Sequence, residues 1–198
     1  MISFYTLFPD RLNLNGDQAN ILVLQKRLEW AGIASEVVDL TTVKQLEKLS
    51  VDFTDDPHGK FLLVGHGSIA AMRSFASMHE AVRSAVLELA KAGLPGLAVG
   101  SGYELVIPDF SRGQRLSDYA DIAAADGLPR IHGYLNTDTD LPAVRAIGDS
   151  FICTMVHGPV LARTPELADL FLGRMGVQVV SSSDSLEADA ISASANQN

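Results

Sequence analysis

Cysteine is almost absent from this chain, which has only Cys153 among its 198 residues. A single thiol cannot form an internal disulfide, and it cannot supply a zinc site built from several cysteines. This scarcity suits a reducing compartment, so we expect a cytoplasmic protein. The five histidines and the carboxylates also show no metal-ligand spacing such as HExxH, and we expect no metal site.

Positive charge and long apolar runs are scarce as well. Lysine and arginine number 15 against 24 aspartates and glutamates, which gives a formal net charge of -9. Such a balance repels nucleic acid and anionic membrane surfaces. No run reaches the roughly 18 apolar residues of a membrane-spanning helix, and the first residues lack the basic start of a secretory signal. We therefore expect no nucleic acid and no membrane span, with small molecules and proteins as partners.

The first half of the chain alternates apolar strands with helical patterns. An alternation of this kind favours an α/β fold with a parallel sheet covered on both faces. Ser68 is expected to cap one long helix. The expected elements are a strand at 2–8, a helix at 17–30 capped by Asp17, a helix around 43–49, a loop at 51–59, a strand at 60–65, the long helix at 68–89 and a strand at 97–100.

The second half is less regular. Residues 107–128 are expected to be loops, and three consecutive strand patterns suggest an antiparallel extension of the central sheet. Residues 179–198 are rich in serine and alanine, and we expect a mobile terminus or a weak helix after one domain at 1–178. The expected elements here are strands at 130–136, 143–148 and 151–158, and a helix from Thr164 to about Met175.

The stretch LAVGSGYEL, residues 97–105, is typical of a sharp strand-to-helix turn. In α/β sheets such turns project into the ligand crevice beyond the carboxyl ends of the strands. The backbone N–H that follows the apex can help to stabilise an oxyanion. Here the apex is Gly100, which has no side chain, and the next residue is Ser101.

Three segments together resemble the cobyric-acid-synthase-like glutamine amidotransferases, most closely the glutaminase subunits of lipid II isoglutaminyl synthases. The segments are LFPDRLNLNGDQANILVLQKRLEWAGI at 7–33, LAVGSGYEL at 97–105, and VHGPVLARTPELADLFL at 156–172. The second resembles the Cys-Gly-Gly-Tyr-Gln nucleophile turn of the family, and the third its His-Gly-Pro block. Order and spacing agree over roughly residues 1–175.

The resemblance implies a three-layer class I amidotransferase fold of flavodoxin-like type. In that family a cysteine thiolate attacks the glutamine amide, a histidine moves protons, and ammonia passes to a Mur-ligase-like partner subunit. By position, His157 falls where the catalytic histidine belongs and Gly100 where the cysteine belongs. A thioester needs a nucleophilic atom, and glycine supplies none.

Other positions of the implied site also depart from the family. Ser101 replaces a glycine, Glu104 replaces a glutamine, and the segment around Asn136 lacks the histidine and arginine of the family's Asn-His-Gly-Gly-Arg stretch. We therefore expect a degenerate site without a cofactor, able to hold glutamine or a related small molecule. The substrate-binding positions that the resemblance implies are Gly65, His66, Gly67, Tyr103, Glu104 and Asn136.

Two interpretations of the chemistry stay open at this point. The first is a non-hydrolysing partner or regulator of a Mur-ligase-like enzyme, in a heterodimer. The alternative is an active amidotransferase or hydrolase that uses Ser101 with His157, or a cobyric-acid-synthase-type amidation role. Cys153 lies ~13 Å from His157 if one extended strand holds both, at about 3.3 Å per residue, so we expect it to pack in the core.

A polar cluster follows the first expected strand. Its side chains cradle a ligand, shape the mouth of an ammonia route, or fix the loop through Asx-turns and helix capping. The cluster consists of Asp10, Asn13, Asp17 and Asn20.

Overall fold

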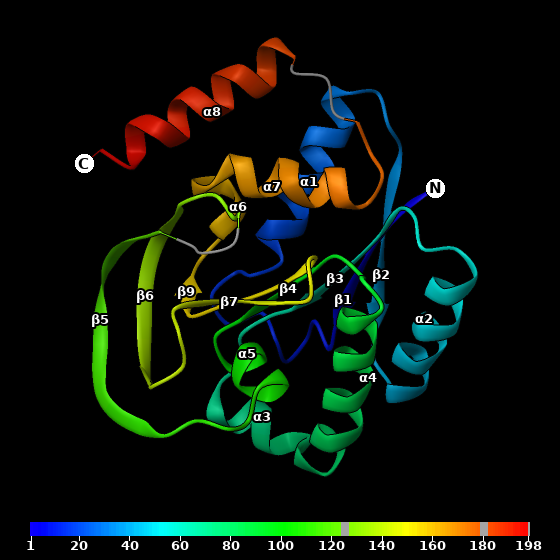
Figure 1. The fold of residues 1–198 in the computed structure, drawn as a ribbon, viewed down its shortest axis with the longest axis vertical. Coiled ribbons are helices and arrows are strands. Elements are labelled where there is room, and N and C mark those ends of the chain that lie inside the picture. The colour runs from blue at the N-terminus through cyan, green and yellow to red at the C-terminus, as the bar shows by residue number, and fades with distance from the viewer. Residues whose placement is uncertain (124–126, 179–181, 198) are drawn as a thin grey trace.

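A six-stranded sheet runs through the centre of the protein in the computed structural model, which describes residues 1–123, 127–178 and 182–197 (Figure 1). Five neighbouring strands are parallel, and β7 is antiparallel to β8 at one edge. The expected α/β class and mainly parallel sheet are confirmed, in an arrangement compatible with a flavodoxin-like fold. In sheet order the strands are β2 (Ser35–Leu40), β1 (Ile2–Leu7), β3 (Lys60–Val64), β4 (Gly96–Val99), β8 (Phe151–Thr154) and β7 (Val144–Ile147).

Helices cover both faces of this sheet and bury a separate apolar cluster on each side (Figure 1). Strand residues that point to opposite faces, such as Phe61 and Leu62, join opposite clusters and are both fully buried. Continuous apolar strands are typical of such a doubly covered sheet. One face holds α1 (Ala19–Trp30), α6 (Val160–Arg163) and α7 (Pro165–Arg174), and the other holds α2 (Val43–Asp55), α4 (His79–Lys91) and α5 (Ser101–Val106).

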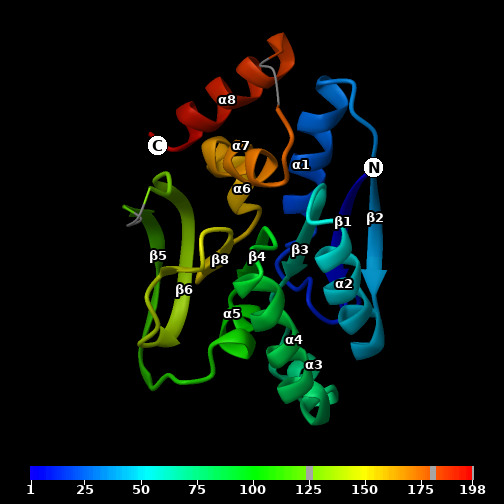
Figure 2. The ribbon, with the colours of Figure 1, turned by 45° about the vertical axis from the view of Figure 1, so that its right-hand side comes forward.

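A second, antiparallel sheet stands beside the first (Figure 2). It consists of β5 (Arg112–Ile122), β6 (Ile131–Thr139) and the short β9 (Val156–His157), and we call the β5–β6 pair the ribbon. The antiparallel extension of the central sheet is therefore limited to β7, because the strand predicted at 130–136 belongs to this second sheet. The expectation of loops over 107–128 is wrong for residues 112–122, where β5 lies. Most of β5 is exposed to solvent, so its sequence carries no apolar alternation to mark it as a strand.

Three helix predictions also need correction. The helix expected over 68–89 is broken at the buried Phe75, so that Ser68 caps only α3 (Ile69–Ser74), and a 3-10 turn (η1, Ala76–Met78) precedes α4. The loop expected at 51–59 is helical as far as Asp55, because α2 continues through it. Asp17 does not cap α1, whose N-cap is Gln18 without a side-chain hydrogen bond.

The serine-rich tail forms the helix α8 (Ser183–Ala195), so the helical alternative for this segment matches the structure. The helix lies outside α1 and α7, and its C-terminal end approaches the ribbon (Figures 1 and 2). Asp189 pairs with Arg27 of α1, and the Ser192 hydroxyl donates to the Ala162 carbonyl at 2.6 Å. The expected domain boundary lies between residues 178 and 179. Residues 179–181 lie outside the described part of the chain.

No helix among the described residues combines the length and the apolar character needed to cross a bilayer.

Candidate functional site

The strand-to-helix turn predicted at LAVGSGYEL is present where β4 ends and α5 begins. Gly100 stands between them with a positive φ of 55° and a ψ of -116°. Gly102, in the first turn of α5, packs directly on the backbone of β3, because an added Cβ would lie 2.4 Å from the Val64 carbonyl oxygen. The turn is therefore held by close contact of backbone with backbone.

Two imidazole rings occupy the space that a side chain at position 100 would need. A Cβ built on Gly100 would lie 2.5 Å from His66 Nδ1 and 2.6 Å from His157 Cε1. The two rings meet edge to face with their centroids 4.7 Å apart. Any side chain at this position must first displace a histidine, and the positive φ adds strain for an L-residue.

Both ring nitrogens of His157 are engaged in hydrogen bonds. Nε2 lies 2.9 Å from the backbone carbonyl oxygen of Asn136, and Nδ1 lies 2.7 Å from Nδ2 of Asn15. A carbonyl only accepts and an amide NH₂ only donates, so the ring is neutral with its proton on Nε2. Burial lowers the pKa of His157 and favours this neutral form. The ring presents a carbon, Cε1, toward Gly100.

The backbone donors at the turn are also satisfied from within the protein. The Ser101 N–H donates to His66 Nδ1 at 3.0 Å, and the Gly67 N–H donates to the Ser101 hydroxyl at 2.8 Å. The same hydroxyl donates to the Gly67 carbonyl at 3.0 Å. Burial, with a smaller contribution from His157, lowers the pKa of His66 to about 4. A tetrahedral anion formed here would find neither N–H free.

The loop after β1 supports these groups. Asp17 is fully buried, and its Oδ2 accepts the backbone N–H of His66 at 2.9 Å. Burial raises the pKa of Asp17 to about 6 against the opposing effect of that hydrogen bond. Gly65 must be a glycine because an added Cβ would lie 2.0 Å from the Leu12 carbonyl oxygen of the same loop.

Most of the predicted polar cluster fastens this loop. Asn13 Oδ1 accepts the Gln18 N–H at 3.0 Å, and Asn20 Nδ2 donates to the Asp17 carbonyl at 2.9 Å. Asp10 is exposed at the start of the loop. These contacts match the loop-fixing interpretation of the cluster, although Asp17 acts on His66 and not on the helix.

Three further predicted positions lie away from the turn's centre. Glu104 forms an ion pair with Arg112 at 3.0 Å, and burial raises the pKa of its carboxyl. The Asn136 side-chain oxygen accepts a hydrogen bond from Arg115 Nε at 3.0 Å. Asn136 therefore contacts His157 through its backbone carbonyl and not through its side chain. Tyr103 is fully buried in the core, and burial raises the pKa of its hydroxyl to about 12.

The buried thiol of Cys153 belongs to the same apolar cluster as Tyr103. Burial raises the pKa of this thiol, which therefore stays protonated. The prediction that it packs in the core is confirmed. Within the described residues no group of three or more histidine, cysteine, aspartate or glutamate side chains is placed to hold a metal ion.

The structure thus brings His66, Gly67, Gly100, Ser101 and His157 together in one small cluster. Sequence reasoning missed Asn15, whose side chain donates to His157. The available signal was its place in the run from Asn13 to Asp17, where every second residue carries a side-chain amide or carboxyl.

No protein-family model matches this chain, and a comparison with curated proteins finds no match. The resemblance to glutamine amidotransferases therefore stays a prediction from the residues, and the chemistry of the site follows from its geometry.

Proposed function

We propose that this chain is a glutamine amidotransferase-like protein that does not hydrolyse glutamine. It acts by contact, as a partner or regulatory subunit of a Mur-ligase-like amidation enzyme. The absence of glutamine hydrolysis is proposed because His66 and His157 occupy the space that a nucleophile at position 100 would need.

Each step of glutamine hydrolysis lacks its group at this turn. Covalent capture of the amide carbon needs a nucleophilic atom, and residue 100 has only hydrogen. Stabilisation of the oxyanion needs free N–H donors, and those of Ser101 and Gly67 are engaged. Proton transfer needs an available imidazole nitrogen, and both nitrogens of His157 are hydrogen-bonded elsewhere.

The Ser101 alternative gains no support from the geometry. Its hydroxyl donates to the Gly67 carbonyl, whereas a serine nucleophile donates to a histidine nitrogen. It is the Ser101 backbone N–H, and not the hydroxyl, that contacts His66. The serine side chain therefore has no general base in position to activate it.

The proposed partner depends on the resemblance over residues 1–175. In this proposal the Mur-ligase-like subunit catalyses the ammonia-dependent amidation of a carboxylate, and this chain is bound to that subunit. A cobyric-acid-synthase-type partner is the alternative, and assays with each type of ligase distinguish the two by which ligase responds.

The first test is a glutaminase assay on the native chain, with and without a Mur-ligase-like partner. We expect no ammonia release above buffer, and a changed rate of the ligase when free ammonium is supplied. Gly100→Cys should stay inactive because the rings of His66 and His157 occupy the space of the new side chain. Glutamine turnover by the native chain that disappears in His157→Ala would overturn the proposal.

A second variant removes one of the two steric obstacles. In Gly100→Cys combined with His66→Gly, only the His157 ring still meets the Cβ, and the Ser101 N–H is released. We expect the introduced thiol of the double variant to react with a thiol reagent faster than that of the single variant. Glutamine hydrolysis should still be poor, because His157 stays bound to Asn15 and Asn136. Efficient glutamine hydrolysis by the single variant would show that the histidines are no obstacle.

A further inference from the structure

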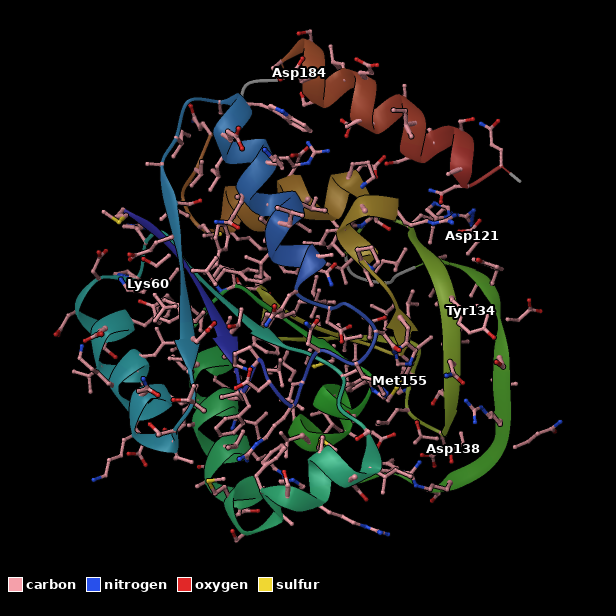
Figure 3. The ribbon with its side chains drawn as sticks, turned by 180° about the vertical axis from the view of Figure 1, so that it is seen from behind. Lys60, Asp121, Tyr134, Asp138, Met155 and Asp184 are labelled. Carbon is pink, nitrogen blue, oxygen red and sulfur yellow. The ribbon has the colours of Figure 1, made fainter. Side chains whose placement is uncertain are left out.

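A groove runs between the ribbon and the C-terminal half of α8. Two adjoining hollows of about 410 and 450 Å³ form it, and they share Tyr119, His132, Gly133, Arg163 and Ala195. Figure 3 shows the labelled Tyr134 on the ribbon, with Asp121 near the end of the ribbon that meets α8. These volumes are in the range of small-molecule sites.

The larger hollow is free of negative charge over its described lining. The carboxylate of Asp121 borders the smaller hollow, where it pairs with Arg130 at 2.9 Å and lies 3.6 Å from Nδ1 of His132, which lines both hollows. Arg163 is the one lysine, arginine, aspartate or glutamate in that described lining, so the local charge favours an anion over a cation. The polar and aromatic groups of this wall are the phenol rings of Tyr119 and Tyr134, the imidazoles of His132 and His157, the Ser192 hydroxyl and the guanidinium of Arg163.

Arg163 faces neutral acceptors in this groove. Its Nη1 donates to the Ala195 carbonyl at 3.1 Å and lies 3.4 Å from Asn196 Oδ1. Its guanidinium carbon lies 5.7 Å from the centre of the Tyr119 ring. Within the described ranges Arg163 forms no ion pair with a carboxylate, and a bound anion would supply that partner.

The aromatic wall is exposed and preorganised. Tyr119 is 70% exposed, and its ring meets that of Tyr134 edge to face at 5.5 Å. The Tyr134 hydroxyl lies 2.6 Å from the Ser117 hydroxyl, which fixes the ring. Exposed tyrosine faces of this kind stack on planar rings. On the opposite wall, Ile191 of α8 is 65% exposed and supplies apolar contact.

We propose that this groove binds a small molecule made of a planar aromatic ring with one carboxylate or phosphate. The ring stacks on the exposed face of Tyr119, and the anionic group meets Arg163. The proposal does not depend on the proposed function. His157 borders both the groove and Gly100, so a ligand here would lie next to the turn without entering it.

Isothermal titration of the full chain tests this inference with two whole probes, which carry both an aromatic ring and an anionic group, and with their halves, which carry one of the two. The aromatic carboxylate is N-acetyltryptophan, and its half is the uncharged N-acetyltryptophanamide. The aromatic phosphate is AMP, and its halves are adenosine and inorganic phosphate. We expect one-to-one binding of at least one whole probe, at least tenfold tighter than its halves. Preference for one whole probe identifies whether the anion is a carboxylate or a phosphate. If neither whole probe binds more tightly than its halves, the proposal fails.

Two variants locate the bound probe. Tyr119→Ala should weaken binding about tenfold, because alanine substitution of one stacked aromatic ring has an effect of this order. Arg163→Gln should weaken the whole probe at least tenfold while leaving the uncharged half unchanged. Native affinity in both variants would overturn the proposal.

Two controls accompany these variants. Because Arg163 also contacts the end of α8, amide exchange across α8 must be measured in Arg163→Gln to show that the helix stays in place. Arg73→Gln removes the same charge from an exposed position on α3, outside the lining of both hollows, and should bind the probes normally. Equal weakening by Arg73→Gln and Arg163→Gln would indicate a general charge effect and would contradict the assigned role of Arg163.

Discussion

The turn at Gly100 and the groove beside the ribbon are neighbouring polar regions with opposite organisation. At the turn, His66, His157, Ser101 and the Gly67 N–H are matched inside the protein, and glycines let backbone pack on backbone. In the groove, aromatic faces are exposed and a guanidinium meets only neutral oxygens. Groups that satisfy one another stabilise the fold, whereas a guanidinium without a carboxylate partner is available to an anionic ligand.

The largest expected effect comes from disturbing the packing at the turn. Gly102→Ala should lower the free energy of unfolding by roughly 3 kcal/mol, because its Cβ meets the Val64 and Gly65 carbonyl oxygens at 2.4 and 2.6 Å. Chemical denaturation followed by circular dichroism measures this loss. Gly173→Ala in α7, where an added Cβ meets nothing within 4 Å, is the control and should be neutral or slightly stabilising. Equal effects of the two variants would contradict the packing argument.

The second prediction concerns the pH dependence of stability, because Asp17 and His66 titrate with opposite effects on the free energy of unfolding. The pKa of Asp17 is raised to about 6 from 3.8, so its contribution to stability is present below pH 3.8 and is lost as pH rises through 6. The pKa of His66 is lowered to about 4 from 6.5, so its contribution is present above pH 6.5 and is lost as pH falls through 4. Between pH 4 and 6 the two contributions oppose each other.

Single variants separate the two slopes. With Asp17→Asn, stability should fall as pH drops from 6 to 4, and with His66→Gln it should rise over the same interval. The slope that Asp17 causes should reach up to about 3 kcal/mol, because one pKa unit is worth ~1.4 kcal/mol. The slope that His66 causes should be smaller, because its ring is only partly buried and solvent screens its charge. Urea denaturation at pH 4, 5 and 6 measures both, and parallel slopes would show that these groups do not control the pH dependence.

The smallest expected effect concerns the groove, one wall of which is formed by α8. Asp189→Asn weakens the link to the buried Arg27, which keeps its partner Asp169 at 2.8 Å. Global stability should change by less than about 1 kcal/mol, while amide exchange in α8 becomes several-fold faster. Exchange in α5 should not change. Glu187→Gln on the exposed face of α8 is the control, and an equal acceleration there would contradict the role of the ion pair.

Sequence patterns predicted the elements that are buried on both sides and missed those that are exposed. Apolar runs marked β1, β3, β4 and β8, because parallel strands between two helical layers have no polar face. In β5, RGQRLSDYADI offers no apolar alternation, and its pairing with β6 is fixed by tertiary context. The break at Phe75 was also hidden, because a buried aromatic residue fits the helical period whether the helix continues or ends.

For the site, pattern and resemblance supplied the positions but not the bonds between them. The strand-to-helix turn at Gly100 and the interest of His157 could both be predicted. That His66 fills the space at Gly100 depends on how two loops meet, and no local pattern records this. Asp17 was assigned to the start of α1, yet its carboxylate accepts the His66 N–H from a segment 49 residues away. Such long-range contacts become visible only once the sheet order is known.

One residue, Met155, separates β8 of the central sheet from β9 of the second sheet. Gly100 is bonded to the first of these, through its N–H to the Thr154 carbonyl at 2.9 Å, while His157 belongs to the second and pairs with Tyr134. Residue 100 and the ring packed against it are therefore carried by different sheets with a one-residue joint between them. A displacement of the ribbon relative to the central sheet would therefore change the contact between the His157 ring and Gly100.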